Sequence, residues 1–297
     1  MTKKRILFNV LSGAAIGVCA IIPGVSGGTA AVLLGVYASI IAAAGNLKRS
    51  FKESVLYLLP FASGVVLGIA AMYFPIKICM DKVPLATLLV FAGLVVGALP
   101  NTVHSAVKSG ISVWSTAAAV IACGAVIGLC FIPNIGSIDL GADMPVYGYF
   151  LLLPVGAVAA FALVVPGISG SMLLLIFGYY RPILDTVSAL ASEPSHSLLV
   201  LFVFAVGVLL GLVFAVFVIK RLLAKYPKIA NRTIVGLVVG SVPSVFLSFD
   251  FTGFKFGAAE IAAGAALCAV CIVATFLLAK AVSKRGNDAE IFYGSKP

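Results

Sequence analysis

Pro23-Gly24-Val25-Ser26-Gly27-Gly28 interrupts a long apolar stretch, and Pro166-Gly167-Ile168-Ser169-Gly170-Ser171 interrupts another in the second half of the chain. A helix break inside a bilayer is costly, because the backbone groups freed there must be satisfied by protein, by water in a cavity or by a ligand. Matching breaks in two halves of a chain are typical of the substrate sites of secondary transporters. The two motifs therefore predict a membrane fold and a place in it where a ligand binds.

The composition also indicates a bilayer protein. Hydrophobic residues make up 62% and charged residues 10% of the 297 residues, and the mean hydropathy is +1.20. Soluble domains are nearly half apolar and about a quarter charged. We therefore expect an all-α polytopic membrane protein, with residues 1–297 forming a single membrane domain. The net charge of +10 comes from short basic runs between apolar segments, which is a topology signal and does not suggest a nucleic-acid partner.

The two motifs belong to an internal repeat. Aligning residue n with residue n + 143 runs from Pro23/Pro166 to Pro100/Pro243 without a gap. The matched positions include Gly35/Gly178, Tyr37/Tyr180, Gly64/Gly207, Gly68/Gly211, Lys77/Lys220 and the identical segments Gly93-Leu-Val-Val-Gly97 and Gly236-Leu-Val-Val-Gly240. Such regular glycines and prolines indicate gene duplication. We expect repeat one at about 6–132, repeat two at about 149–280, and a short cytoplasmic tail over 281–297.

Each repeat is expected to contain one broken segment and three ordinary spans. The broken segments cover residues 6–45 and 149–189, and their arms of about 16 residues are shorter than the roughly 20 that a full crossing needs. That length favours a re-entrant helical hairpin, with two short tilted crossings as the alternative. The ordinary spans are expected at about 54–76, 84–106 and 112–132, and at about 197–219, 230–249 and 257–280.

Basic residues decide the predicted orientation. With the N-terminus in the cytoplasm, most of the 20 Lys and Arg residues fall in cytoplasmic segments, whereas the outer loops 133–147 and 187–197 contain none. An odd number of crossings per repeat makes the two halves inverted, so that the hairpins enter from opposite faces. Lys3-Lys4-Arg5 and the apolar run after it also resemble a signal peptide, but the counterpart in the second half favours a retained segment. We therefore expect a multi-pass protein of the bacterial cytoplasmic membrane with both termini in the cytoplasm.

The breaks have the residue types of an anion site. Ser26 and Ser169 stand where helix N-caps would, with helices resuming near Thr29 and Met172. A helix N-terminus presents unpaired N–H groups and a partial positive charge, and bare glycines let an anion approach the amides. Hairpin tips that meet at mid-membrane would form a phosphate- or carboxylate-sized site; the alternative is a tight turn that serves only close packing. The expected substrate-binding residues are Gly24, Ser26, Gly27, Gly28, Thr29, Gly167, Ser169, Gly170, Ser171 and Arg181.

Arg181 is the only charged residue among these candidates. It follows Gly178-Tyr179-Tyr180, replaces Ala38 at the matching repeat position, and has Asp185 one helical turn further on. Its guanidinium could draw an anionic head group from the outer face, and the alternative is an interfacial arginine that snorkels to water. The sequence shows no Cys/His/carboxylate spacing for a metal and no P-loop, so we expect no metal, no cofactor and no ATP-driven pump.

The motifs PGVSGGTAAVLLGVY at 23–37 and PGISGSMLLLIFGYY at 166–180 resemble the paired signatures of the bacterial polyprenyl-phosphate (undecaprenyl-phosphate) transporters of the PopT type. The resemblance extends over essentially the whole chain. It implies a transporter and not an enzyme: a flippase that takes undecaprenyl phosphate across the cytoplasmic membrane and recycles the spent carrier lipid for cell-wall synthesis. The partners implied are the polyprenyl-phosphate lipid and the bilayer, and the architecture is compatible with a homo-oligomer.

The physical chemistry agrees with such a substrate. A prenyl chain prefers lipid, whereas a phosphate cannot cross hydrocarbon unaided. A transporter need only shield the head group, which we expect at the two hairpin tips with alternating access of the inverted repeats. One alternative is a secondary transporter of a small soluble anion that uses the same helix N-terminus site. Another is an integral-membrane lipid-phosphate enzyme, which is disfavoured because His104 and His196 are the only histidines and lie far from both motifs in sequence.

Overall fold

The computed structural model describes residues 3–21, 26–133, 138–141, 144–249 and 251–283. Within these ranges the chain folds into helices without a strand, and six of the helices are long and apolar enough to cross a membrane. Two further pairs of short helices pass the same test together but are sharply bent. The protein is thus an all-α polytopic membrane protein, as the composition predicts.

The helices of the two halves correspond closely in length and spacing. The first half contains α1 (Lys3–Ile21), α2 (Gly27–Leu33), α3 (Tyr37–Gly45), α4 (Phe51–Lys82), α5 (Pro84–Lys108) and α6 (Val113–Leu129). The second half contains α7 (Val146–Val164), α8 (Gly170–Ile176), α9 (Tyr180–Ser188), the 3₁₀ turn η1 (Ala189–Ala191), α10 (Pro194–Lys225), α11 (Pro227–Leu247) and α12 (Ala258–Ser283). The bounds of α1 to α4 recur in α7 to α10 at the repeat offset. The helices after the breaks begin two residues earlier than expected, and α12 continues into the expected tail.

The return arm of each hairpin is bent, which the sequence analysis did not anticipate. The axes of α2 and α3 differ by 114°, and the axis of α8 differs by 102° from that of α9 together with η1. Gly35 and Gly178 stand at the bends with φ of 70° and 76°, a left-handed conformation that favours glycine. The two N–H groups after each helix bond back to its last turn, as in a Schellman motif. The sequence signal for these bends is the matched pair of glycines itself.

Helices α1 and α4 lie side by side and run in the same direction. A side chain at Gly13 would collide with the backbone of Phe61, and one at Gly64 with the backbone of Val10. Gly207 and Gly211 of α10 meet the backbone of α7 in the same way. These small residues let the backbones approach closely, as the Gly-x-x-x-Gly spacing predicts. Because α1 and α4 are parallel, the segment between them returns to the end where α1 begins, which is the path that a re-entrant hairpin requires.

The identical Gly-Leu-Val-Val-Gly segments join the two halves. Gly93 and Gly97 of α5 press against Cys268 and Ile272 of α12. The matching Gly236 and Gly240 of α11 press against Ala119 and Cys123 of α6. Each segment therefore packs on a helix that comes from the opposite half of the chain, and α5 also packs on α11 between them. In each half, therefore, the helix with the Gly-Leu-Val-Val-Gly segment has its close packing partner in the other half.

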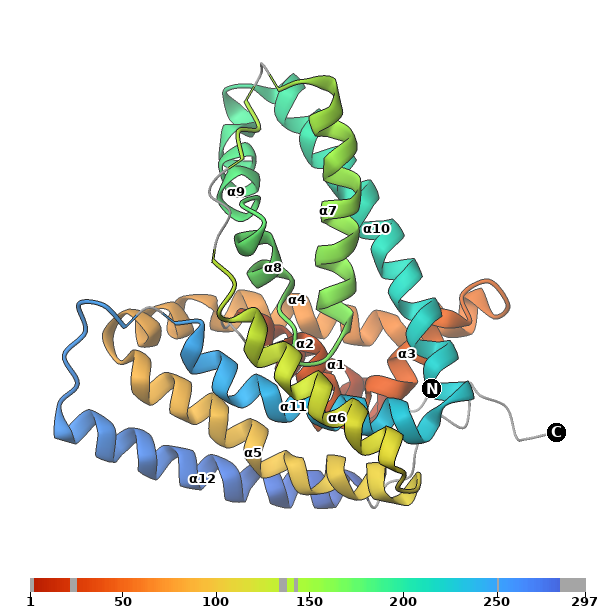
Figure 1. Ribbon diagram of the computed structural model, residues 1–297, viewed down its shortest axis with the longest axis vertical. Coiled ribbons are helices and arrows are strands. Elements are labelled where there is room, and N and C mark those ends of the chain that lie inside the picture. The colour runs from red at the N-terminus through yellow and green to blue at the C-terminus, as the bar shows by residue number, and fades with distance from the viewer. Residues whose placement is uncertain (1–2, 22–25, 134–137, 142–143, 250, 284–297) are drawn as a thin grey trace.

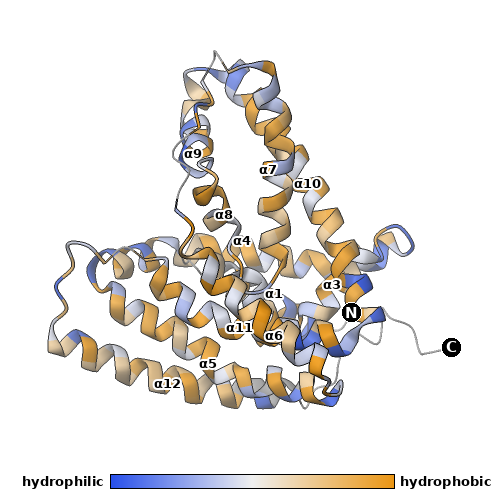
Figure 2. Ribbon diagram, in the orientation of Figure 1, coloured by the Kyte–Doolittle hydropathy of each residue, from blue (hydrophilic) through white to orange (hydrophobic). Residues whose placement is uncertain are grey.

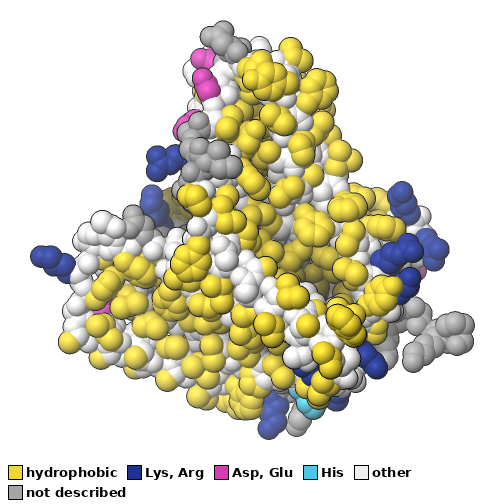
Figure 3. All heavy atoms as spheres, viewed as in Figure 1, with side chains coloured by type: hydrophobic (Ala, Val, Ile, Leu, Met, Phe, Trp, Pro, Cys, Tyr) yellow, Lys and Arg dark blue, Asp and Glu magenta, His cyan; other side chains and the backbone are white. Residues whose placement is uncertain are grey.

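The helices form two groups in space. Figure 1 shows α7, α8, α9 and α10 standing upright above a layer that contains α4, α5, α11 and α12. Apolar residues cover the long helices, and hydrophilic ones collect at helix ends and loops (Figure 2). The face drawn in Figure 3 is accordingly hydrophobic, with Lys and Arg at its margins. The helices of the upright group lie at a steep angle to those of the layer, so the two groups do not share one obvious membrane plane. The inverted orientation of the two halves in the membrane therefore stays a prediction.

Close backbone contact between α1 and α4 predicts a sharp difference between two glycine substitutions. Gly64→Leu should destabilise the protein by about 1–3 kcal/mol, because the added side chain has no room against α1. Gly124→Leu is the matched control, since no atom lies within 4 Å of a Cβ added there. Thermal unfolding in detergent measures both. Equal melting temperatures for the two variants would contradict this packing.

Candidate functional site

The first break ends in an N-capped helix. Ser26 is extended (φ −95°, ψ 136°), and its Oγ accepts a hydrogen bond from the N–H of Gly28 at 3.1 Å. Gly27 begins α2, and residues 26–30 are all buried. The predicted N-cap is therefore in place, with a bare glycine backbone behind it. Gly24, also an expected binding residue, lies outside the described residues.

The second break has the same backbone course but different hydrogen bonds. Ser169 precedes α8 in an extended conformation, yet its side chain does not cap the helix. Its Oγ lies 2.8 Å from the Oγ of the exposed Ser171, with which it shares a hydrogen bond. Gly170 is confined too, because an added Cβ would lie 2.6 Å from the Ala159 carbonyl oxygen. Gly167 has a φ of +84° and packs against the backbone of Leu237 in α11, so only glycine fits there.

The two breaks touch each other. The N–H of Gly167 donates to Oγ1 of the fully buried Thr29 at 2.7 Å. Ser26 Oγ donates to the carbonyl oxygen of Val165 at 3.3 Å. Gly28 completes the contact, since a Cβ there would lie 2.9 Å from the Val164 carbonyl oxygen. Thr29 and Gly167, which are 138 positions apart in sequence, thus lie in one polar centre among apolar helices. This centre consists of the groups of the two breaks that meet here, together with the Val164 and Val165 carbonyls.

In this arrangement the polar groups of the breaks satisfy one another. The N–H groups of Gly28 and Gly167 both donate to side-chain hydroxyls of the first motif. Helices α2 and α8 are each only seven residues long, so their aligned dipoles are shorter than the sequence analysis assumed. An anion bound here would therefore depend mainly on individual N–H and O–H donors. An anion would replace hydrogen bonds that the protein makes to itself.

Arg181 is not part of this centre. It is the second residue of α9, exposed, and separated from the second break by α8 and the bend at Gly178. No hydrogen bond or ion pair of Arg181 with the break residues is found in the described part of the chain. The other side of the contact is formed by the backbone of Val164, Val165 and Leu237, which were not among the predicted site residues. Any residue supplies the same backbone groups, so the sequence does not mark them. The motif glycines were the one signal that another backbone segment packs closely at the breaks.

The hydrogen bond between the two breaks predicts a stability effect. Thr29→Val should destabilise the protein by about 1–3 kcal/mol, because it leaves the Gly167 N–H buried without its acceptor. Thr29→Ser keeps the hydroxyl and should recover most of the loss. Thr87→Val is the matched control, since that exposed hydroxyl bonds only to Val83 in its own helix. Thermal melts that do not separate Thr29→Val from Thr87→Val would argue against the contact.

Comparison with known proteins assigns the family. A model of the undecaprenyl phosphate translocase-like family matches residues 1–117 and 102–252. A polyprenyl-phosphate transporter from Staphylococcus aureus is 30% identical over 244 residues, which cover 80% of this chain and 85% of that protein. A polyprenyl-phosphate transporter from Vibrio cholerae is 25% identical over 256 residues, covering 81% and 77%. No solved structure shows a significant match. The chain belongs to the undecaprenyl phosphate translocase-like family.

Proposed function

We propose that this protein is a flippase that carries a polyprenyl phosphate across the bacterial cytoplasmic membrane, with the phosphate head group bound where the two helix breaks meet. The observation that carries the proposal is the hydrogen bond from Gly167 N–H to Thr29 Oγ1, which joins the two motifs among apolar helices. The names of the two relatives support the substrate class. The proposed function needs no nucleophile or acid–base pair, because moving the lipid across the membrane breaks and forms no covalent bond.

The centre offers donors that suit a phosphate. Hydroxyls come from Ser26, Thr29, Ser169 and Ser171, and backbone N–H groups come from Gly28 and Gly167. A phosphate oxygen is a stronger acceptor than a neutral hydroxyl, since charge-assisted hydrogen bonds are shorter and stronger. The head group would take over the N–H groups while the hydroxyls rotate to donate to it. In this structure these groups make hydrogen bonds within the protein, so none of them is left buried and unsatisfied.

The lipid tail needs no pocket of its own. The outside of the helices is apolar, and Leu175 of α8 and Phe177 directly after it are exposed. A prenyl chain can lie along such a surface in the bilayer while only its head group is shielded. A site made of a few polar donors within an apolar protein suits such a substrate, because only the head group needs to be shielded from the lipid.

Alternating access follows from the repeat. We propose that the first hairpin opens the centre toward the cytoplasm and the second opens it outward, with both termini cytoplasmic. A shared centre built from one break of each half can then face either side without moving far. The head group crosses when one hairpin closes the centre on its side and the other opens it on the opposite side. The tail follows in the lipid.

Transport of a labelled lipid tests this function. In proteoliposomes, the wild-type protein should make the phosphate of a fluorescent polyprenyl phosphate accessible from the opposite leaflet. The double variant Ser169→Ala/Ser171→Ala should slow this at least tenfold, because it removes hydroxyl donors worth about 1.5–3 kcal/mol each to a charged group. Ser63→Ala is the control, since that exposed hydroxyl bonds only to Pro60.

Two results would overturn parts of the proposal. Movement of inorganic phosphate without movement of the lipid would assign the protein to soluble-anion transport through the same centre. Wild-type rates in the Ser169→Ala/Ser171→Ala variant would remove the break from the substrate path. Lipid movement with an unchanged control and a slow double variant supports both the substrate and the site.

A further inference from the structure

The two hairpins match in sequence but differ in packing. Helix α3 of the first hairpin packs on α10 of the other half, whereas no comparable packing of α9 on α4 is found among the described residues. Ile41 of α3 is 2% exposed, and its counterpart Leu184 is 48% exposed. On the receiving helices, Ala215 of α10 is fully buried, and its counterpart Met72 of α4 is 39% exposed. One hairpin is therefore docked across the halves and the other is not.

A lysine holds the docked hairpin. Lys220 Nζ of α10 donates to Asn46 Oδ1 at 2.6 Å and to the carbonyl oxygen of Gly45 at 3.1 Å. These acceptors lie at the C-terminal end of α3, where the helix presents unpaired carbonyl groups and a partial negative charge. The stem of the lysine also packs against Gly45. Lys220 is thus a clamp between the halves and not merely an interfacial anchor.

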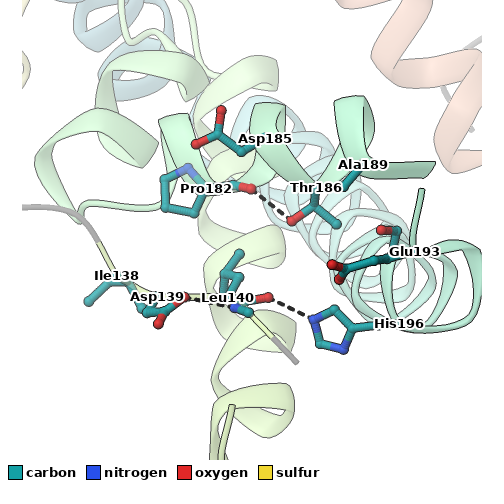
Figure 4. A pocket seen from close by; sticks show the side chains of 11 residues that line it. Ile138, Asp139, Leu140, Pro182, Asp185, Thr186, Ala189, Glu193 and His196 are labelled. Carbon is teal, nitrogen blue, oxygen red and sulfur yellow. Dashed lines mark hydrogen bonds between the residues drawn. The ribbon is translucent and has the colours of Figure 1, made fainter. Parts of the chain in front are cut away.

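The counterpart of Lys220 is Lys77, which is exposed near the end of α4. The place that corresponds to its binding site, at the end of α9, is a cavity of about 390 Å³. Figure 4 shows Asp185 on α9, Asp139 on the loop before α7 and Glu193 before α10 around this cavity. The acceptors of Lys220 correspond to Ser188 and Ala189 of the second half. Ala189 lines this cavity together with the three carboxylates.

A buried hydroxyl in the cavity wall also lacks a partner. Ser197 is 1% exposed, its Oγ makes no hydrogen bond in the described part of the protein, and it lines the cavity. Buried polar groups in folded proteins are almost always paired. Its repeat counterpart Ser54 is likewise buried without a partner among the described residues, although Lys220 is already bound at the first hairpin, so this hydroxyl is a feature of both halves. The three carboxylates at the cavity do not form one cluster, because the described residues contain no group of three such side chains placed to hold a metal ion. An ammonium group needs only one of them as its partner.

The cavity is already built around a fixed frame. His196 Nε2 lies 2.7 Å from the Leu140 carbonyl oxygen, and its Nδ1 lies 3.1 Å from the hydroxyl of Tyr149 (Figure 4 shows the first contact). The N–H of Ile138 donates to the carbonyl oxygen of Gly178 at the bend of the second hairpin. These bonds tie the loop to α10 and to the bend, and α10 to α7, and so fix the frame of the cavity.

We propose that the acidic cavity at the end of α9 receives the ammonium group of Lys77 when the second hairpin docks on α4. This clamp takes the place of the Lys220 clamp, so that one hairpin is held at a time. The inference rests on the proposed alternating access and names the contact that defines its second state. The exposed strips around Met72 and Leu184 become buried in that state, as Ala215 and Ile41 are in this one.

Thiol cross-linking tests the docking. In a background without the six native cysteines, the pair Lys77→Cys/Ser188→Cys should be joined by a short bifunctional maleimide in part of the population. Lys220→Cys/Gly45→Cys is the matched control, because it joins the contact already present. Adding Lys220→Met to the first pair should raise its yield severalfold by releasing the competing clamp. A control pair that links while the 77/188 pair never does, with or without polyprenyl phosphate, would overturn the proposal.

Carbodiimide coupling tests the charge pairing on the native side chains and needs no cysteine-free background. It should join Lys77 to Asp185, Glu193 or Asp139 in the otherwise unaltered protein, and Lys77→Arg should abolish the product because a guanidinium does not couple. Absence of any such product in protein that transports lipid would overturn the clamp and leave the proposed function standing. The coupled product in protein that moves no polyprenyl phosphate would support the clamp and overturn the function.

Discussion

The structure depends on the contact between two interrupted helices, made by the N–H of Gly167 and the hydroxyl of Thr29. A break in an apolar segment frees backbone groups that lipid cannot satisfy. Here hydroxyls of the first break satisfy backbone groups of the second, since Thr29 accepts from Gly167 and Ser26 donates to Val165. The contact also explains why the motifs contain glycines and small hydroxyl residues, since backbone must meet backbone while donors stay within reach.

The surrounding packing keeps this contact in position. Glycines on α4 and α10 bring the hairpins close to their long helices, and the Gly-Leu-Val-Val-Gly segments of α5 and α11 bind helices of the opposite half. Within that frame the return arms differ between the halves, as do the hydrogen bonds of Ser26 and Ser169. The arm that ends at Gly45 is clamped by Lys220, and the arm that ends at Ser188 faces an acidic cavity. Under the proposed alternating access, this inequality between equivalent arms would distinguish one state from the other.

Much of this organisation could be predicted from the repeat. Glycines and prolines in register predicted the breaks, the long helices and the Ser26 cap, because these depend on local backbone chemistry. The bends at Gly35 and Gly178 were visible only as matched residues, since a positive φ is not written in the sequence. The partners of the breaks are backbone groups of Val165 and Leu237, which any residue could supply. Sequence symmetry also could not say which hairpin is docked, because the difference is one of conformation.

The most direct test of the central claim is a distance between the phosphorus of the bound lipid and the motif backbone. Pro-Gly occurs only at 23–24 and 166–167, so carbonyl-labelled proline with ¹⁵N-glycine selects the two break amides alone in solid-state NMR. With polyprenyl phosphate in the bilayer, the ³¹P nucleus should dephase the Gly167 amide signal, as expected at hydrogen-bonding distance. An undiminished Gly167 signal in protein saturated with the lipid would contradict a head-group site at the breaks.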